Sequence, residues 1–241
     1  MRRFYSPPEN SKENKISLNL DETRHLRDVL RLREGEKVHV FDGGGKEFLC
    51  EIETIEKQRT LLKIIDQVPP KSPESNLNLT LAIALLKGEK FDLVVQKACE
   101  LGVSKIIPLN SKRADVRLKD VKEAAKKLER WQKIALEAAK QCGRAKLMSI
   151  EMPMDFAEFI QTADGTKILF AEKAGISFSS LESSNSMTAV VGSEGGWEDA
   201  EIELASAKGF QIITLGGRIL RAETAAITVS ALLQNHFGDL R

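Results

Sequence analysis

The chain has 241 residues, of which 42% are hydrophobic, and its formal net charge is +1 at neutral pH. This composition is ordinary for a folded protein with a sizeable core, and it excludes the disordered and fibrous classes. The sequence contains no run of 18 or more apolar residues and no signal-peptide pattern, so we expect no membrane association and a cytoplasmic protein.

The N-terminal part, residues 1–70, predicts a small β-rich domain. Strand-like patterns cover residues 2–5, 37–41, 46–56 and 60–67, and Gly43 to Gly45 form a predicted hairpin turn. One helix, from Asp21 to Leu30, interrupts these strands.

Basic residues gather in two segments of this nearly neutral chain. Residues 1–33 hold eight Lys or Arg against five Asp or Glu, and residues 111–146 hold twelve against five. Such clusters are typical of a surface that contacts phosphates. The predicted RNA contacts are Arg2, Arg3, Arg24, Arg27, Arg31, Arg113 and Arg144. The alternatives stay open: Glu22 and Asp28 can pair with some of the N-terminal arginines, and residues 119–146 can form a solvated, lysine-rich helix.

A proline-rich linker, residues 68–76, predicts a domain boundary near residue 70, which divides the chain into 1–70 and 71–241. Strand and helix patterns alternate after it. The predicted strands are 77–85, 105–109, 147–150, 167–171, 187–191 and 211–215, and the predicted helices are 89–101, 120–142, 155–162, 198–208 and 223–237. This alternation indicates an α/β domain with a mainly parallel sheet covered by helices.

Two glycine-bearing loops, residues 190–197 and 215–224, each follow a predicted strand and precede a predicted helix. Ligands of open α/β sheets bind beyond the carboxyl ends of the strands, so two such loops predict one pocket. Neither loop has the glycine spacing of the dinucleotide fingerprint or of the P-loop. The alternative is that the glycines only close tight turns.

The histidines and cysteines give no metal or disulfide signal. His25, His39 and His236 lie in separate segments, and Cys50, Cys99 and Cys142 include no closely spaced pair. We therefore predict no metal cofactor and reduced thiols.

The sequence around these loops resembles a known family, the SPOUT-class RNA methyltransferases of the RsmE type. The matching segments include G-x-E-G-G-W from Gly192, L-G-x-R-I-L-R-x-E-T-A from Leu215, Glu100-Leu101-Gly102-Val103, and Gln141-Cys142-Gly143-Arg144. One departure is Ser193, where the family usually has proline. The resemblance implies a PUA-like β-barrel, a trefoil-knotted catalytic domain, a homodimer, and methylation of uridine N3 in 16S rRNA of the small ribosomal subunit with S-adenosylmethionine.

For the cofactor, the resemblance predicts contacts from three strand-end segments and the last helix. The predicted cofactor-binding residues are Leu169, Ala171, Val191, Gly192, Glu194, Gly195, Leu215, Gly216, Ile219, Leu220 and Ala225. Uridine N3 carries a proton that must leave, so a base or an anion-stabilising group is needed. We predict Glu223 and Arg221 as the catalytic residues. The alternative for Glu223 is a structural role at the start of the last helix.

The last predicted helix has a wide apolar surface. Its apolar residues are Ala226, Ile227, Val229, Ala231, Leu232, Leu233 and Phe237. One side of the helix can pack on the sheet, so a second subunit is predicted to cover the other side; complete burial within a monomer is the alternative.

Two other functions are alternatives to methyl transfer: a non-catalytic RNA-binding or ribosome-assembly factor, and a dinucleotide-dependent enzyme.

Overall fold

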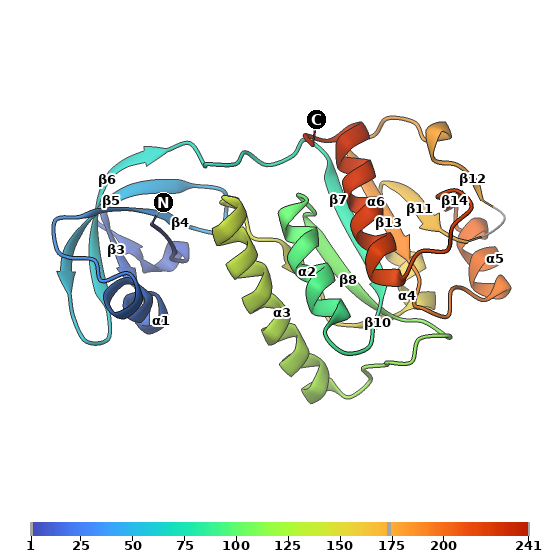
Figure 1. Ribbon diagram of the computed structural model, residues 1–241, viewed down its shortest axis with the longest axis horizontal. Helices are drawn as coiled ribbons and strands as arrows, with labels where there is room; N and C mark the ends of the chain where they lie inside the picture. Colours follow the sequence, from blue (N-terminus) through green and yellow to red (C-terminus); the bar gives the residue numbers. More distant parts are fainter. Residues whose placement is uncertain (1, 173–174, 241) are drawn as a thin grey trace. The chain divides into compact units, whose positions relative to one another are not determined.

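The computed structural model describes residues 2–172 and 175–240 (Figure 1). Within these ranges no helix is long and apolar enough to cross a membrane. The chain divides into two compact units: one combines the chain up to Glu74 with Ala139–Leu147, and the other contains Ser75–Ala138 and the chain from Met148 onward. The sequence predicted a single boundary near residue 70. It gave no sign that the end of the long helix and the loop after it join the N-terminal unit.

The N-terminal unit is built on a six-stranded sheet with the order β1-β4-β5-β6-β3-β2. Only the β1–β4 pair is parallel. The strands are β1 (Arg3–Tyr5), β2 (Ser11–Lys12), β3 (Lys15–Leu18), β4 (Lys37–Phe41), β5 (Glu47–Ile55) and β6 (Thr60–Val68). The short β2 and β3 were missed, because Glu13 and Asn14 between them adopt positive φ, which interrupts any strand pattern. Two register shifts in the β5–β6 pair bend the sheet around a core that includes Phe4, Leu26 and Val40.

The predicted helix at 21–30 is irregular. A 3-10 turn, η1 (Pro8–Asn10), precedes it in the chain, and the helix itself begins as α1 (Leu20–Arg24) and continues as a π-helical turn, η2 (His25–Val29). Asn19 caps α1, since its side chain accepts a hydrogen bond from the backbone N–H of Glu22 at 2.9 Å. The π-helical turn has a wider side-chain spacing than the regular α-helix that the pattern predicted over this segment.

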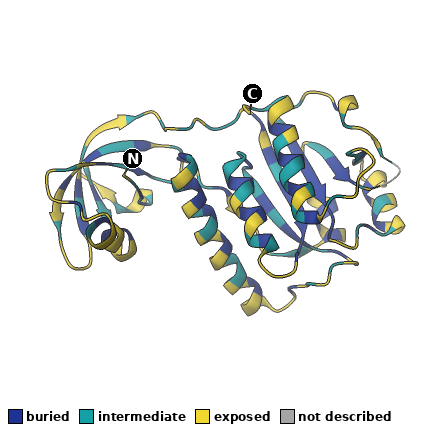
Figure 2. Ribbon diagram, viewed as in Figure 1, coloured by how far each residue is buried: buried dark blue, intermediate teal, exposed yellow. Residues whose placement is uncertain are grey.

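The C-terminal unit contains an eight-stranded sheet, in which every pair is parallel. The order is β10-β8-β7-β13-β11-β14-β12, with β9 also pairing with β8. The strands are β7 (Asn78–Ala84), β8 (Lys105–Asn110), β9 (Ser149–Ile150), β10 (Met154–Asp155), β11 (Thr166–Phe170), β12 (Ile176–Ser177), β13 (Ser186–Val191) and β14 (Gln211–Thr214). Near-continuous apolar runs in β7 and β13 fit a parallel sheet that is buried on both faces, as Figure 2 shows.

Helices cover both faces of this sheet (Figure 1). They are α2 (Lys90–Glu100), α3 (Val121–Cys142), α4 (Phe156–Thr162), α5 (Asp199–Ala207) and α6 (Ala222–Phe237), and a 3-10 turn, η3, spans Phe178–Ser180. Helices α4 and α5 pack with the core cluster that includes Leu169, Val190 and Phe210. Helix α6 packs against α2, β7 and β13. The predicted α/β fold with a parallel sheet is therefore confirmed, and the trefoil knot stays a prediction of the resemblance.

Candidate cofactor site

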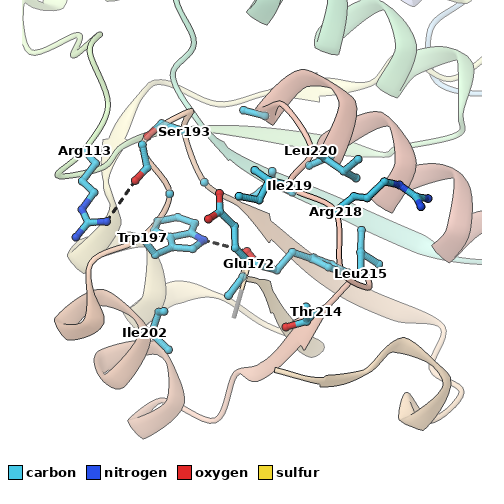
Figure 3. A pocket seen from close by; sticks show the side chains of 18 of the residues that line it. Arg113, Glu172, Ser193, Trp197, Ile202, Thr214, Leu215, Arg218, Ile219 and Leu220 are labelled. Carbon is cyan, nitrogen blue, oxygen red and sulfur yellow. Dashed lines mark hydrogen bonds between the residues drawn. The ribbon is translucent and has the colours of Figure 1, made fainter. Parts of the chain in front are cut away.

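A cavity of about 320 Å³ lies at the carboxyl ends of three neighbouring strands. Strand β11 pairs with β13 on one side and with β14 on the other, and Phe170 is in register with both Val191 and Ile213. The segments that follow the three strands line the cavity (Figure 3). The lining residues are Arg113, Phe170, Ala171, Glu172, Val191, Gly192, Ser193, Gly195, Gly196, Trp197, Asp199, Ile202, Thr214, Leu215, Gly216, Gly217, Arg218, Ile219, Leu220, Ala222 and Ala225. This is where a parallel sheet is expected to bind a ligand.

The first glycine loop turns sharply after β13. The N–H of Gly196 donates to the carbonyl of Ser193 at 2.9 Å, and Gly196 has a φ of +68°, which favours glycine. Trp197 then turns back under the loop, where its indole Nε1–H donates to the carbonyl of Phe170 at 3.0 Å and its ring lies 4.8 Å from that of Phe156. The indole therefore ties this loop to the end of β11.

Two glycines of the first loop are required by close packing. A Cβ on Gly192 would lie 3.1 Å from the Trp197 ring, and a Cβ on Gly195 would lie 2.9 Å from the carbonyl oxygen and Cβ of Arg113. Arg113 also donates to the carbonyl of Gly195 at 3.4 Å (Figure 3). A side chain at either position would collide with Trp197 or Arg113 and displace the loop. These glycines therefore affect ligand binding indirectly, through the position of the loop.

The second glycine loop has a more open backbone. Gly216 has a φ of +83°, and a Cβ on Gly216 or Gly217 would meet no atom within 4 Å. Helix α6 packs over β7 and β13, two or more strands away from β14, so the loop from Leu215 to Arg221 must cross the ends of the intervening strands. Bare backbone groups and the apolar side chains of Leu215, Ile219 and Leu220 therefore border the cavity.

An ion cluster joins the first loop to the starts of two helices. Lys90, the first residue of α2, lies 2.6 Å from a Glu194 carboxylate oxygen and 3.9 Å from Oε2 of Glu223 in the first turn of α6. Burial, the largest single influence, would raise the pKa of Glu194, but the hydrogen bond from Lys90, a backbone hydrogen bond and the positive charges of Lys90 and Lys87 together lower that pKa below its usual range. The same hydrogen bond raises the pKa of Lys90. The pair therefore stays ionised at neutral pH and holds Glu194 away from the cavity wall.

The structure brings together nine of the eleven residues predicted to bind the cofactor. Ala171, Val191, Gly192, Gly195, Leu215, Gly216, Ile219, Leu220 and Ala225 line the cavity. Leu169 does not, because it lies inside β11, two residues before Ala171, and its fully buried side chain belongs to the core beside α4 and α5. Glu194 does not, because its carboxylate turns to Lys90.

Several lining residues were missed from the sequence, most notably Glu172 and Thr214. Glu172 lies between Trp197 and the loop that carries Leu215 and Ile219 (Figure 3). It is the second residue after β11, so its place just beyond the carboxyl end of a central strand was the signal that would have identified it. Thr214 ends β14 and its hydroxyl accepts the N–H of Gly175 at 3.1 Å.

The two predicted catalytic residues flank the cavity. Arg221 is exposed and precedes α6, while Glu223 follows the lining residue Ala222 and is half-buried. Oε2 of Glu223 is buried and accepts no hydrogen bond from the described residues. An orphaned carboxylate oxygen beside a cavity suits a group that receives a proton from a ligand.

The predicted RNA-contacting arginines separate into buried and exposed groups. Arg3 donates to Glu47 at 3.0 Å and to the carbonyls of Ala139 and Arg144, and only 4% of its side chain is exposed. Arg144 is also buried and pairs with Glu74 at 2.6 Å. Both side chains hold the N-terminal unit together, so the structure does not support direct phosphate contact by either.

The other predicted arginines reach the surface. Arg24, Arg31 and Arg113 are exposed. Arg2 pairs with Glu36, and Arg27 pairs with Asp28 at 2.7 Å. The pairing of Arg27 with Asp28 is thus the alternative that the sequence left open for this arginine. Arg113 lines the cavity.

Comparisons with known proteins agree with this architecture. A family model described as an RNA methyltransferase domain matches residues 73–234, and one described as an RNA methyltransferase PUA domain matches residues 18–65. The chain is 34% identical to the ribosomal RNA small subunit methyltransferase E of Synechocystis sp., over 97% of this chain and 78% of that protein. Its counterpart in Rickettsia conorii is also 34% identical, over 99% of this chain and 98% of the relative.

A solved structure is similar over the whole length. The ribosomal RNA small subunit methyltransferase E of Neisseria gonorrhoeae, bound to S-adenosyl methionine, has a TM-score of 0.91 and 34% identity, and the match covers 100% of both chains. The fold and the strand-end cavity thus define an RNA methyltransferase with an N-terminal PUA domain. Within that class, the chain belongs to the ribosomal RNA small subunit methyltransferase E family.

Proposed function

We propose that this enzyme transfers the methyl group of S-adenosylmethionine to N3 of a uridine in the 16S rRNA of the small ribosomal subunit. S-adenosylmethionine-dependent methylation of rRNA follows from membership of the family. The N3 position and the particular residues are our inference. The observation that carries it is the strand-end cavity, built from the segments whose motifs gave the family resemblance. We place the reaction in the cytoplasm.

The cavity suits a ligand with both apolar and charged parts. Leu215, Ile219, Leu220 and Ala225 offer apolar contacts, and the bare backbone at Gly216 offers hydrogen-bonding groups. We propose that these residues, with Ala171, Val191, Gly192 and Gly195, hold S-adenosylmethionine, which supplies the methyl group as a sulfonium. A carboxylate accepts hydrogen bonds only, so Glu172 is suited to ribose hydroxyls or to an ammonium group.

Proton removal from uridine N3 is assigned to Glu223. Its buried Oε2 lacks a hydrogen bond from the described residues and lies 3.9 Å from Nζ of Lys90, at the side of the cavity where a proton acceptor is needed. Arg221, two residues earlier and exposed, is proposed to stabilise the negative charge that develops on the uracil carbonyls. Orientation of the nitrogen in line with the methyl group and exclusion of water supply much of the remaining rate gain.

The proposed RNA contacts lie in both units and are made by the exposed arginines. Arg24 and Arg31 in the N-terminal unit and Arg113 at the cavity are exposed, and we propose that they meet phosphates, with Arg113 giving up its hydrogen bond to the Gly195 carbonyl. Arg2 and Arg27 would have to exchange their carboxylate partners for a phosphate.

We also propose a homodimer that uses α6. On this helix Ile227, Thr228 and Ala231 are half-buried and Leu232 is 36% exposed, so an apolar strip faces outward. Leu93 of helix α2, which packs against α6, is also 41% exposed. A second subunit on this strip would lie beside the start of α6, where Arg221 and Glu223 are found.

Calorimetric titration with S-adenosylmethionine and, separately, with NAD tests the cofactor assignment. We expect S-adenosylmethionine to bind with one site per chain and NAD not to bind. Binding of NAD alone would indicate a dinucleotide-dependent enzyme. Binding of rRNA without either cofactor would indicate a non-catalytic RNA-binding factor.

A further inference from the structure

A second cavity, also of about 320 Å³, lies in the C-terminal unit beyond the end of β8. Its walls come from the segment after β8, the start of α4 and the start of α5. The lining residues are Asn110, Ser111, Lys112, Arg117, Lys119, Asp155, Phe156, Ala157, Ala200, Glu201 and Leu204. None of them lines the cofactor cavity.

The two cavities nevertheless adjoin along the chain at two places. Lys112 lines the second cavity and Arg113 lines the first, and Asp199 lines the first while Ala200 lines the second. Consecutive Cα atoms are about 3.8 Å apart, so the two cavities share the chain at 112–113 and at 199–200 as parts of their walls.

The segment from Ser111 to Lys119 is held in a fixed shape. The N–H of Leu118 donates to the side-chain oxygen of Asn110 at 3.0 Å, which closes the segment into a loop. The backbone N–H of Lys112 donates to buried Glu201 at 3.2 Å, and Arg117 donates to the carbonyl of Lys112 at 2.6 Å. The loop therefore presents its basic side chains without needing to reorganise, which lowers the entropic cost of binding.

The lining carries three basic side chains against two acidic ones, Asp155 and Glu201, and contains a hydroxyl without a hydrogen-bond partner among the described residues. Within the described ranges, the Lys119 side chain has neither a hydrogen bond nor an ion pair. The Arg117 guanidinium uses one N–H for its hydrogen bond to the Lys112 carbonyl, and no described residue accepts a hydrogen bond from its other N–H groups. Ser111 is 2% exposed and its Oγ has no hydrogen-bond partner among the described residues. A buried hydroxyl without a partner costs free energy, unless a ligand supplies the missing bond.

We propose that this second cavity binds the ribonucleotide next to the target uridine in a single-stranded stretch of RNA. Arg117 and Lys119 contact its phosphates, and Ser111 hydrogen-bonds its sugar or base. Asp155 accepts a hydrogen bond from a ribose 2′-hydroxyl or a base N–H, which distinguishes a nucleotide from a free phosphate. The proposal rests on the proposed function, because it takes the target uridine to lie beside the S-adenosylmethionine that the first cavity holds.

Fluorescence anisotropy with a labelled single-stranded decaribonucleotide that contains one central uridine tests this site. The test variant of the full chain is Arg117→Ala with Lys119→Ala. The matched control is Lys126→Ala with Lys127→Ala, which removes the same charge from α3 of the same unit. We expect the test variant to bind roughly tenfold more weakly and its salt dependence to fall by about 1.4 log–log units, since each lost single-strand phosphate contact removes about 0.7. The control should resemble the wild type.

Ser111→Ala gives a second readout. Removal of an unpaired hydroxyl should leave thermal stability unchanged or slightly higher, while RNA affinity falls. Equal RNA affinity in the wild type and both test variants, or an equal loss in the lysine control, overturns the second site. If the wild type binds S-adenosylmethionine and the RNA in these cases, the proposed function stands and only this site is rejected. If the wild type does not bind S-adenosylmethionine, the proposed function itself fails.

Discussion

Replacement of Arg3 by methionine removes the central cation of a buried network in the N-terminal unit. Arg3 donates to the Glu47 carboxylate and to two backbone carbonyls, and its guanidinium lies 4.1 Å from the centre of the Phe41 ring. The Glu47 side chain is only 1% exposed. Among the described residues, the other side chain paired with this carboxylate is His39, whose Nδ1 lies 3.1 Å from Oε1 of Glu47. The substitution therefore leaves a buried carboxylate without its strong cation.

The expected loss is large for a unit of this size. Breaking a buried ion pair by removing one partner costs about 3–5 kcal/mol. Typical domains have a free energy of unfolding of about 5–15 kcal/mol, so the variant loses a substantial share of that stability. We expect the midpoint of thermal unfolding of the N-terminal unit to fall by roughly 12 °C or more, taking about 4 °C per kcal/mol for a small domain.

Urea and thermal unfolding, followed by circular dichroism, measure this effect. Arg24→Met is the matched control, because Arg24 is an exposed arginine of the same unit and should leave stability unchanged. A second substitution in the same chain, Glu47→Leu, should recover part of the loss, since it removes the unpaired charge. Wild-type stability of Arg3→Met would refute the structural role of Arg3 and return it to the set of RNA contacts.

Three further predictions concern the glycine loops, the ion pair between Lys90 and Glu194, and the assembly. Gly216→Val and Gly195→Val should both weaken S-adenosylmethionine binding in calorimetry, the first because a β-branched residue is strained at a φ of +83° and the second because its Cβ meets Arg113 at 2.9 Å and displaces the loop. Unchanged affinity in both would remove the loops from the cofactor site. Cofactor affinity should be flat around neutral pH and fall in acid: the pKa of Glu194 is lowered by Lys90, so the ion pair is complete above the usual carboxyl range and is lost as pH falls through the lowered value. A Lys90→Met variant that keeps the wild-type pH profile would contradict this. Sedimentation equilibrium should give a dimer, and a single species at 26.8 kDa would reject it.

The regular elements were predictable from local pattern. Strand β4 has the bounds expected from its sequence, Lys37–Phe41, and α2, α5 and α6 differ by only one residue at either end. Alternation of apolar strands with amphipathic helices fixes such elements locally, and it also fixes a parallel sheet. The strand-end position of the glycine loops followed from the same pattern, so most of the cavity could be located in advance.

Other features depend on contacts between distant residues. Arg3 and Arg144 look like surface charges in the sequence, and only the fold shows that Glu47 and Glu74 bury them in ion pairs. Leu169 is close to the strand end in the sequence, and only the fold shows that the core beside α4 and α5 encloses its side chain while Ala171, two residues further on, reaches the cavity. Glu194 does not line the cavity because its carboxylate pairs with Lys90, which is 104 residues away along the chain. No local sequence pattern predicts that pairing.

The central claim is methyl transfer to uridine N3, and nucleoside mass spectrometry tests it most directly. The purified enzyme is incubated with S-adenosylmethionine and with small-subunit rRNA, both free and assembled, from a strain that lacks the enzyme. The RNA is then digested to nucleosides. We predict N3-methyluridine in the sample with the wild type, and its loss with Glu223→Gln if that carboxylate is the base. Absence of any methylated nucleoside from both substrates, or a methyl group at another position of the uridine, would contradict the account.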